Sequence, residues 1–151
     1  MGKTRSELRD AASNIIYQIY IFEKAGIKYD INELIKEKIE IQNDFVYELV
    51  NGVINNQKEI SKLANKYLVD WDIDRLSKVD KAILSMAIYE LMHTETPKIV
   101  AINEAIELSH KYSDPKVTNM INACLDKIYH EEIENNAKWE IYNGNSINKI
   151  Y

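Results

Sequence analysis

The 151-residue sequence contains only one cysteine, two prolines and four glycines. A lone cysteine excludes an internal disulfide, and because Cys124 stands in an apolar stretch we expect it to be a small buried side chain. The scarcity of proline and glycine leaves little material for long loops, and the apolar residues recur at helical spacing instead of alternating. These features predict an all-α fold that forms one domain.

Long apolar runs are also missing. No run approaches the length of about 18 residues that a membrane span requires, and the N-terminus lacks the apolar core of a secretory signal. We therefore expect a cytoplasmic protein without a membrane partner. The net charge of −5 argues against indiscriminate binding to polyanions. Residues 1–28, however, contain five lysines and arginines against three carboxylates. This short basic end suits a localised contact with nucleic acid, or else is a solvated terminus.

Capping signals predict where the first helices begin and end. Thr4 and Glu7 have the spacing of a capping box, which predicts a helix from about residue 5 to residue 24. Gly26 is expected to terminate it, and Asp30 to cap a short second helix.

The later helices are placed in the same way. Asn43 opens a longer helix that is expected to reach about residue 67 with an interruption only at Gly52, and residues 71–76 are predicted to form one tight turn. Ser77 caps a helix whose body is apolar on nearly every side, which is typical of a central, buried helix. The last two helices are expected at residues 98–111 and 115–134, each opened by a proline.

Two neighbouring segments have a distinctive order of residues. Residues 75–91 read Arg-Leu-Ser-Lys-Val-Asp-Lys-Ala-Ile-Leu-Ser-Met-Ala-Ile-Tyr-Glu-Leu, and residues 98–108 read Lys-Ile-Val-Ala-Ile-Asn-Glu-Ala-Ile-Glu-Leu. They resemble the signature of the NusB family. Blocks at residues 9–10, 45–53 and 122–128 agree with that family in the same order, so the resemblance covers about residues 4–130.

The resemblance implies both a fold and a role. The fold is a compact bundle of about seven helices over residues 1–134, followed by a loosely attached tail over 135–151. The role is that of an RNA-binding transcription antitermination factor, and not that of an enzyme. Its implied partners are the single-stranded boxA element of ribosomal RNA leaders, the ribosomal protein NusE and the RNA polymerase antitermination complex.

The first helix contains a candidate RNA-binding stripe. Arg5, Arg9, Ser13 and Tyr17 are spaced by four residues, so we expect them to share the face opposite the apolar one. Guanidinium groups bind phosphates and an aromatic ring stacks on an unpaired base, which are the two needs of single-stranded RNA recognition. The resemblance adds Asn14 and the arm residue Lys3. The alternative is that Tyr17 lies at the rim of the core and the arginines are solvated.

The resemblance implies that the start of the last helix forms a second wall of the RNA site. The corresponding residues include Asn119, Met120 and Asn122, and Lys116 is expected to restore a positive charge one turn earlier. Asn119 and Met120 replace a lysine and a phenylalanine of the family pattern, which removes one cation and one stacking ring. These departures favour an alternative function, a protein-binding helical module of the same fold with weakened or lost RNA binding.

Arg75 and Asp80 are the candidate partner-binding residues. The resemblance implies that the start of the signature helix faces NusE, and we expect both charges to be exposed there, where charges orient a partner. The alternative is structural: Asp80 caps the helix with Ser77, and Arg75 pairs with a nearby aspartate.

Two Glu-x-x-His motifs, at residues 90–93 and 107–110, raise a metal-binding alternative. Paired motifs of this form hold two metal ions in ferritin-like bundles. Here the histidines fall at the expected helix ends, where they complement the carbonyl groups. We therefore expect no metal, no other cofactor and no catalytic residue. Glu90 is then expected either to be paired or to lie near an edge of the core, because an unpaired buried carboxylate is too costly.

Overall fold

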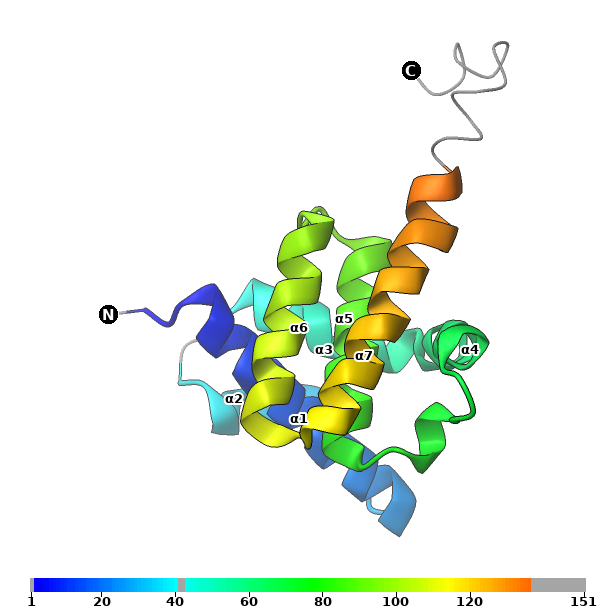
Figure 1. Ribbon diagram of the computed structural model, residues 1–151. Coiled ribbons are helices and arrows are strands. Elements are labelled where there is room, and N and C mark those ends of the chain that lie inside the picture. The colour runs from blue at the N-terminus through cyan, green and yellow to red at the C-terminus, as the bar shows by residue number, and fades with distance from the viewer. Residues whose placement is uncertain (1, 41–42, 137–151) are drawn as a thin grey trace.

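The computed structural model describes residues 2–40 and 43–136 and contains, within them, seven α-helices and no strand. The helices are α1 (Arg5–Ala25), α2 (Ile31–Lys38), α3 (Asp44–Asn55), α4 (Gln57–Tyr67), α5 (Lys78–His93), α6 (Lys98–Tyr112) and α7 (Pro115–Ile128) (Figure 1). A 3₁₀ turn, η1 (Ile73–Arg75), precedes α5, and a π-helical segment, η2 (Tyr129–Glu134), follows α7. The predicted all-α bundle is confirmed.

The ends of α1 follow from its caps. The Glu7 backbone N–H donates to Thr4 Oγ1 at 3.1 Å, and the Thr4 N–H donates to Glu7 Oε1 at 2.9 Å, which completes the capping box. Gly26 ends the helix in the left-handed region, with φ of 70°. The side chains of Asp30, Asn43 and Ser77 cap α2, α3 and α5 as predicted.

The break in the middle of the chain differs from the prediction. The expected long helix is two helices, α3 and α4, and they separate at Asn56 and not at Gly52. Gly52 lies inside α3, where an added Cβ would stand 2.1 Å from Cζ of Tyr89 on α5. The glycine therefore permits the close approach of two helices. It does not interrupt one.

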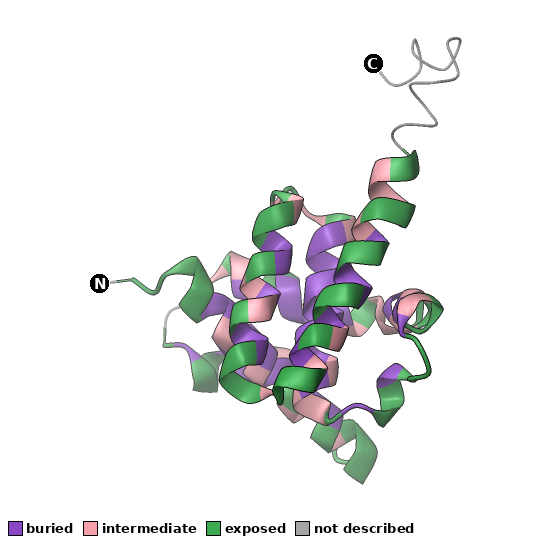
Figure 2. Ribbon diagram, in the orientation of Figure 1, coloured by how far each residue is buried: buried purple, intermediate pink, exposed green. Residues whose placement is uncertain are grey.

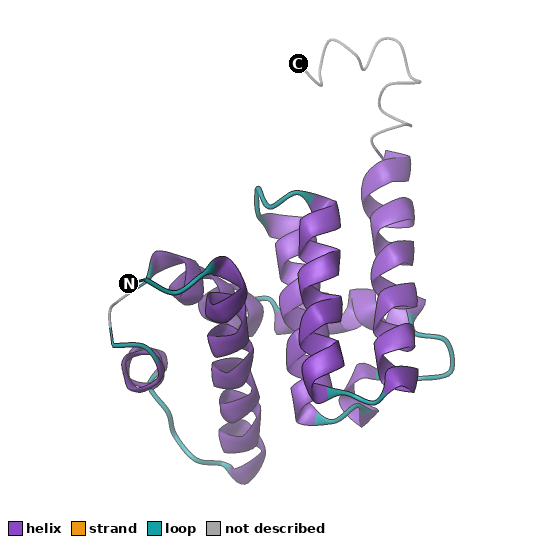
Figure 3. Ribbon diagram, turned by 60° about the vertical axis from the view of Figure 1, so that its left-hand side comes forward, coloured by secondary structure: helices purple, strands orange, loops and turns teal. Residues whose placement is uncertain are grey.

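Helix α5 is the centre of the bundle. Every residue from 82 to 91 is buried, as Figure 2 shows by colour. Helices α1, α3, α4, α6 and α7 all pack against α5. The side view in Figure 3 separates α1 and α2 from the α6 and α7 side of the molecule. An apolar helix enclosed in this way explains why its sequence lacks the one-sided pattern of a surface helix.

The C-terminal end of the fold is less enclosed. Segment η2 has no buried residue and projects past α5 and α6 (Figure 1). Most of the predicted tail, residues 137–151, lies outside the described residues, so the domain boundary at residue 134 stays a prediction. Among the described residues, no helix combines the length and apolarity needed to cross a membrane.

Candidate RNA interface

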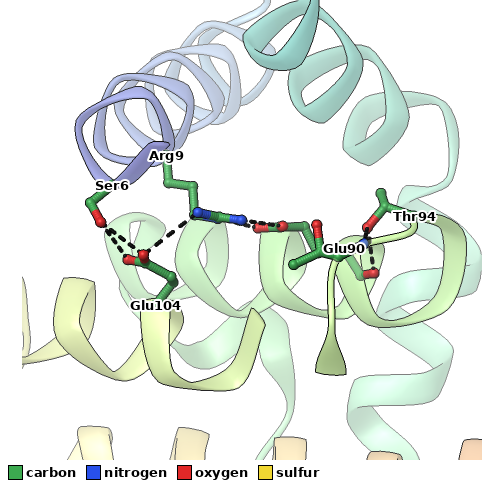
Figure 4. Close-up of polar contacts among 6 residues, drawn as sticks. Ser6, Arg9, Glu90, Thr94 and Glu104 are labelled. Carbon is green, nitrogen blue, oxygen red and sulfur yellow. Dashed lines mark hydrogen bonds and ion pairs between the residues drawn. The ribbon is translucent and has the colours of Figure 1, made fainter. Parts of the chain in front are cut away.

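Arg9, a predicted RNA ligand, is buried. Its guanidinium donates from Nε to Glu90 Oε1 at 2.8 Å and from Nη2 to Glu90 Oε2 at 2.9 Å, and the residue is 4% exposed (Figure 4). Burial by itself would lower the pKa of Arg9, but the hydrogen bonds and charges of Glu90 and Glu104 raise that pKa above its ordinary value. The expectation that Arg9 faces solvent is wrong, and of the two alternatives for Glu90 the paired one is confirmed.

Glu104 of α6 extends this buried ion pair into a three-helix junction. Its Oε1 lies 3.6 Å from Arg9 Nη1 and accepts a hydrogen bond of 2.8 Å from the Ser6 hydroxyl. Thr94, just after the end of α5, lies on the other side of Glu90, and its hydroxyl donates to the Glu90 backbone carbonyl at 2.8 Å (Figure 4). Arg9 therefore fixes α1 against α5 and α6, and its N–H groups are occupied by carboxylates.

Ser13 is also buried, at 5% exposure, and its hydroxyl donates to the Asp10 carbonyl at 2.8 Å. The predicted stripe is therefore not one free surface. Residues spaced by four advance by roughly 40° around a helix of 3.6 residues per turn, so the stripe winds through about 120° between its ends. It starts exposed at Arg5, passes beneath the neighbouring helices, and becomes exposed again at Tyr17.

A more accessible face of α1 contains Asp10, Asn14 and Tyr17 at i, i+4 and i+7, of which Asp10 and Asn14 are half-buried and Tyr17 is exposed. The Asp10 carboxylate accepts from Lys111 Nζ at 2.5 Å, from the Tyr112 hydroxyl at 2.6 Å and from Asn14 Nδ2 at 3.1 Å. Partial burial acts to raise the pKa of Asp10, but the donors Lys111 and Tyr112 outweigh it and hold that pKa below its ordinary value.

The Tyr112 hydroxyl contacts this carboxylate, and Tyr17 lies two helical turns, or roughly 10 Å, further along the same face of α1. Tyr17 is 36% exposed and Tyr112 is 40% exposed. Sequence reasoning found Tyr17 and missed Tyr112, although Tyr112 stands just before the Asp114-Pro115 helix start and so at a predictable helix end. What the sequence does not reveal is that the end of α6 meets the middle of α1. The fold therefore places two aromatic faces and a lysine on one surface.

The first turn of α7 borders that surface. A buried hydrogen bond of 2.7 Å between the hydroxyls of Ser109 and Thr118 ties the end of α6 to the start of α7. Lys116 is exposed between them. Asn119 and Asn122 are exposed, and Met120 is half-buried against the core. Within the described residues, no hydrogen bond or ion pair joins those last three to α1.

The N-terminal arm forms a second basic corner. The Arg5 guanidinium lies 4.1 Å from the centre of the Phe45 ring. Arg5 and the exposed Lys3 line a hollow of about 490 Å³ beside the start of α3. Among the described residues Arg5 makes no hydrogen bond or ion pair through its guanidinium, so its donors are available to a phosphate. Twelve residues along α1 separate Arg5 from Tyr17, or roughly 18 Å at 1.5 Å per residue.

The two candidate partner-binding residues differ in exposure. Asp80 is 7% exposed, its backbone N–H donates to Ser77 Oγ at 3.1 Å, and its carboxylate accepts from the Ser113 hydroxyl. The expectation of an exposed Asp80 is wrong, because the turn between α6 and α7 closes over the start of α5. Arg75 is exposed, and it has no ion pair in the described part of the chain, since Asp74 pairs with Lys81 at 3.0 Å. The role of Arg75 stays a prediction.

The residues of the metal-binding alternative have other partners. Glu90 is held by Arg9 of α1, and His93 Nε2 lies 3.2 Å from Glu59 of α4. Across residues 2–40 and 43–136, no three potential ligands gather as a metal site would require.

The resemblance to a known family is supported by comparison of the sequence with family models. The model of the NusB family matches residues 6–130. The chain belongs to the NusB family.

Curated relatives agree along most of their length. The transcription antitermination protein NusB of Acetivibrio thermocellus is 39% identical over 131 residues, 85% of this chain and 88% of that protein. The NusB of Staphylococcus epidermidis is 36% identical over 126 residues, 83% of this chain and 98% of its own. The NusB of Bacillus subtilis is 35% identical over 127 residues, which are 82% of this chain and 93% of that protein.

Solved structures support the same assignment. T. maritima NusB superposes with a TM-score of 0.75 at 28% identity, covering 87% of this chain and 94% of that chain. A structure of the antitermination factors NusB and NusE in complex with dsRNA gives a TM-score of 0.70 at 26% identity. The match covers 83% of this chain and 96% of that chain. The described helices are thus those of a NusB fold.

Proposed function

We propose that this protein is a cytoplasmic transcription antitermination factor that binds the boxA RNA of ribosomal RNA leaders together with NusE. It acts by assembly into the RNA polymerase antitermination complex and performs no chemistry. Membership of the NusB family supports this role, as does the similarity to a NusB that was solved with NusE and dsRNA. The observation that carries the proposal is the contact of Lys111 and the exposed Tyr112 with Asp10, on the face of α1 that also bears the exposed Tyr17.

The chemistry of that surface suits unpaired bases. Tyr17 and Tyr112 offer aromatic faces on which bases stack, and stacking tolerates any base. Lys116 and the arm residues Lys3 and Arg5 offer positive charge to phosphates on either side of the rings. Asp10 carries a negative charge within this surface, so it repels phosphate. Its role in the proposal is to hold the Tyr112 hydroxyl and the Lys111 ammonium in fixed positions.

A titration of fluorescent boxA RNA, single-stranded and duplex, tests the proposal in the presence and absence of NusE. Tyr17→Ala and Tyr112→Ala are each expected to weaken binding of the single strand by about 1–3 kcal/mol. Tyr17→Phe is expected to lose far less, since stacking does not need the hydroxyl. Tyr47→Ala, which removes an equally exposed ring from α3, is the matched control. If all three alanine variants bind alike, the rings on α1 and α6 are not the RNA site.

NusE binding is tested separately at Arg75. Arg75→Glu reverses an exposed charge that has no ion pair within the described residues, so the fold should be unaffected. We expect weaker NusE binding and an unchanged affinity of the protein alone for boxA, because rim charges act mainly on encounter and register. An unchanged calorimetric affinity for NusE would place the partner elsewhere.

The second candidate function is a protein-binding module that has lost RNA binding. Asn119 and Met120 favour it, because they remove a cation and a ring from the second wall. The same titration separates the two functions. A protein that binds NusE but shows no boxA binding, alone or with NusE, would be such a module.

A further inference from the structure

A groove runs between α1 and α6 on the side away from α7. It consists of two hollows, of about 480 Å³ and 490 Å³, and both are lined by Val100 and Glu104. The first extends along α6 past Glu107, and the second extends to the turn at Pro97 between α5 and α6. The two hollows adjoin at Val100 and Glu104, and we call them together the α1/α6 groove. Figure 4 shows Ser6 of α1 and Glu104 of α6, whose hydrogen bonds of 2.8 and 3.0 Å join the two helices beside the first hollow.

The groove has an exposed apolar surface. Val100 is 42% exposed and lines both hollows, and Pro97 and Phe45 add apolar surface to the second hollow. Leu108, which is buried, forms part of the wall of the first hollow, closer to the C-terminal end of α6. Single exposed apolar side chains need no explanation, but an apolar surface inside a depression is the usual form of a binding groove.

The charge of the groove selects the kind of occupant. Its two hollows are lined by six carboxylates and three lysine or arginine side chains, a balance of 3 − 6 = −3. Two of those cations are neutralised locally, Arg9 by Glu90 and Lys111 by Asp10. Glu95 and Glu107 are exposed and, among the described residues, have no hydrogen bond or ion pair through their side chains. Such a groove repels a polyanion and attracts a cation.

We propose that the α1/α6 groove binds a basic, apolar segment of a partner protein. An apolar side chain of that segment packs on Val100, and its lysine or arginine side chains lie against Glu107 and Glu95. This surface differs from the one proposed for RNA, and the two share Asp10 and Lys111 in the first hollow and Arg5 in the second. The protein would then bind a cationic partner along α6 between Pro97 and Glu107, and RNA at the C-terminal end of α6 near Tyr112.

An NMR titration of the full chain tests the proposal. The probe is a short synthetic amphipathic peptide with leucines on one face and arginines on its flanks, and its control has glutamate in place of each arginine. We expect amide shifts to concentrate at Val100, Glu104 and Glu107 with the arginine peptide alone. Glu107→Lys should weaken binding by up to about fivefold, the contribution of an exposed charge pair. Glu37→Lys, an exposed charge reversal on α2, is the matched control and should bind as the native chain does.

Four outcomes would overturn the proposal. They are the absence of shifts in the groove, equal shifts with the glutamate peptide, equal weakening by Glu37→Lys, and concentration-dependent self-association that Val100→Asp abolishes. The last would assign the groove to a second copy of this chain. Titrating boxA RNA into Glu107→Lys keeps the two proposals apart, because its RNA affinity depends on the surface at Tyr17 and Tyr112 and not on Glu107.

Discussion

The buried pair of Arg9 and Glu90 gives the sharpest prediction. Both residues are almost fully enclosed, at 4% and 1% exposure, and they exchange two hydrogen bonds of 2.8 and 2.9 Å. Removing one partner of a buried pair leaves an uncompensated charge and typically costs about 3–5 kcal/mol. For a chain of this size that corresponds to a fall in melting temperature of roughly 6–20 °C. We expect Arg9→Met to show this loss.

Glu90→Gln is expected to cost less than Arg9→Met. Without Glu90, the guanidinium keeps Glu104 at 3.6 Å, whereas without Arg9 the Glu90 carboxylate loses its only ion-pair partner in the described chain. The double variant Arg9→Met with Glu90→Leu removes both charges, so it should recover most of the stability. Urea denaturation of the native chain, Arg9→Met, Glu90→Leu and the double variant closes a double-mutant cycle and gives the coupling energy of the pair.

Arg5→Met, one turn earlier and exposed, is the control for Arg9→Met. Because Arg5 makes no hydrogen bond or ion pair through its guanidinium among the described residues, this control should lose far less stability than Arg9→Met.

The same variants decide between a structural arginine and an RNA ligand. If Arg9 only positions α1, the folded double variant keeps the native RNA affinity and the native salt slope. If Arg9 binds a phosphate, the slope of log K against log salt should flatten by about 0.7. A flattened slope together with unchanged stability in Arg9→Met would refute the reasoning from burial.

Three further predictions concern the core and the Asp10 cluster. Gly52→Ala should lower the free energy of unfolding in urea by about 1–3 kcal/mol, because its Cβ would stand 2.1 Å from Tyr89 Cζ; a stabilised variant would mean that the ring moves aside freely. Burial raises the pKa of Cys124 to about 12, so the native thiol should resist a colorimetric thiol reagent and react only at the rate of unfolding; fast labelling in buffer would contradict this. The pKa of Asp10 is lowered on folding, so its contribution to stability is present at neutral pH and is lost as pH falls through the folded value. Asp10→Asn should therefore be less stable than the native chain at pH 7 and nearly equal to it at low pH, and an equal gap at both would contradict the assigned cause.

Local signals predicted the helix ends well. The cap at Thr4 and the stop at Gly26 depend on hydrogen bonds within a few residues, so the sequence contains all the information they need. Gly52 was misassigned because its role depends on Tyr89, which lies 37 positions further along the chain and on another helix. A glycine inside a helical pattern indicates either a break or a close approach, and only packing distinguishes them.

The candidate site was predicted less well for the same reason. Periodicity assigns one apolar face to α1, yet α1 packs against α2, α3, α5 and α6, so more of its circumference is enclosed than a single face. Arg9 and Ser13 lie on this additional enclosed part. Tyr112 was missed because its proximity to Asp10 joins residues that are 102 positions apart.

The burial of Arg9 reduces the positive charge that the N-terminal segment can offer to RNA. The basic excess of residues 1–28 is five cations against three carboxylates, and the fold cancels one of those cations with two carboxylates from α5 and α6. The Lys111 charge is likewise held by Asp10. Among the described residues, the other cations that could contact the RNA are Lys116 at the start of α7, Lys38, whose charge acts on Asp10, and Lys3 and Arg5, which lie at the other corner of α1, roughly 18 Å from Tyr17. An RNA surface of this kind must rely on base stacking for much of its affinity, because each phosphate contact adds only a modest, salt-dependent share. This accounts for the proposed need for a second protein on the same RNA, since a partner that supplies further phosphate contacts offsets the cations that the fold has neutralised.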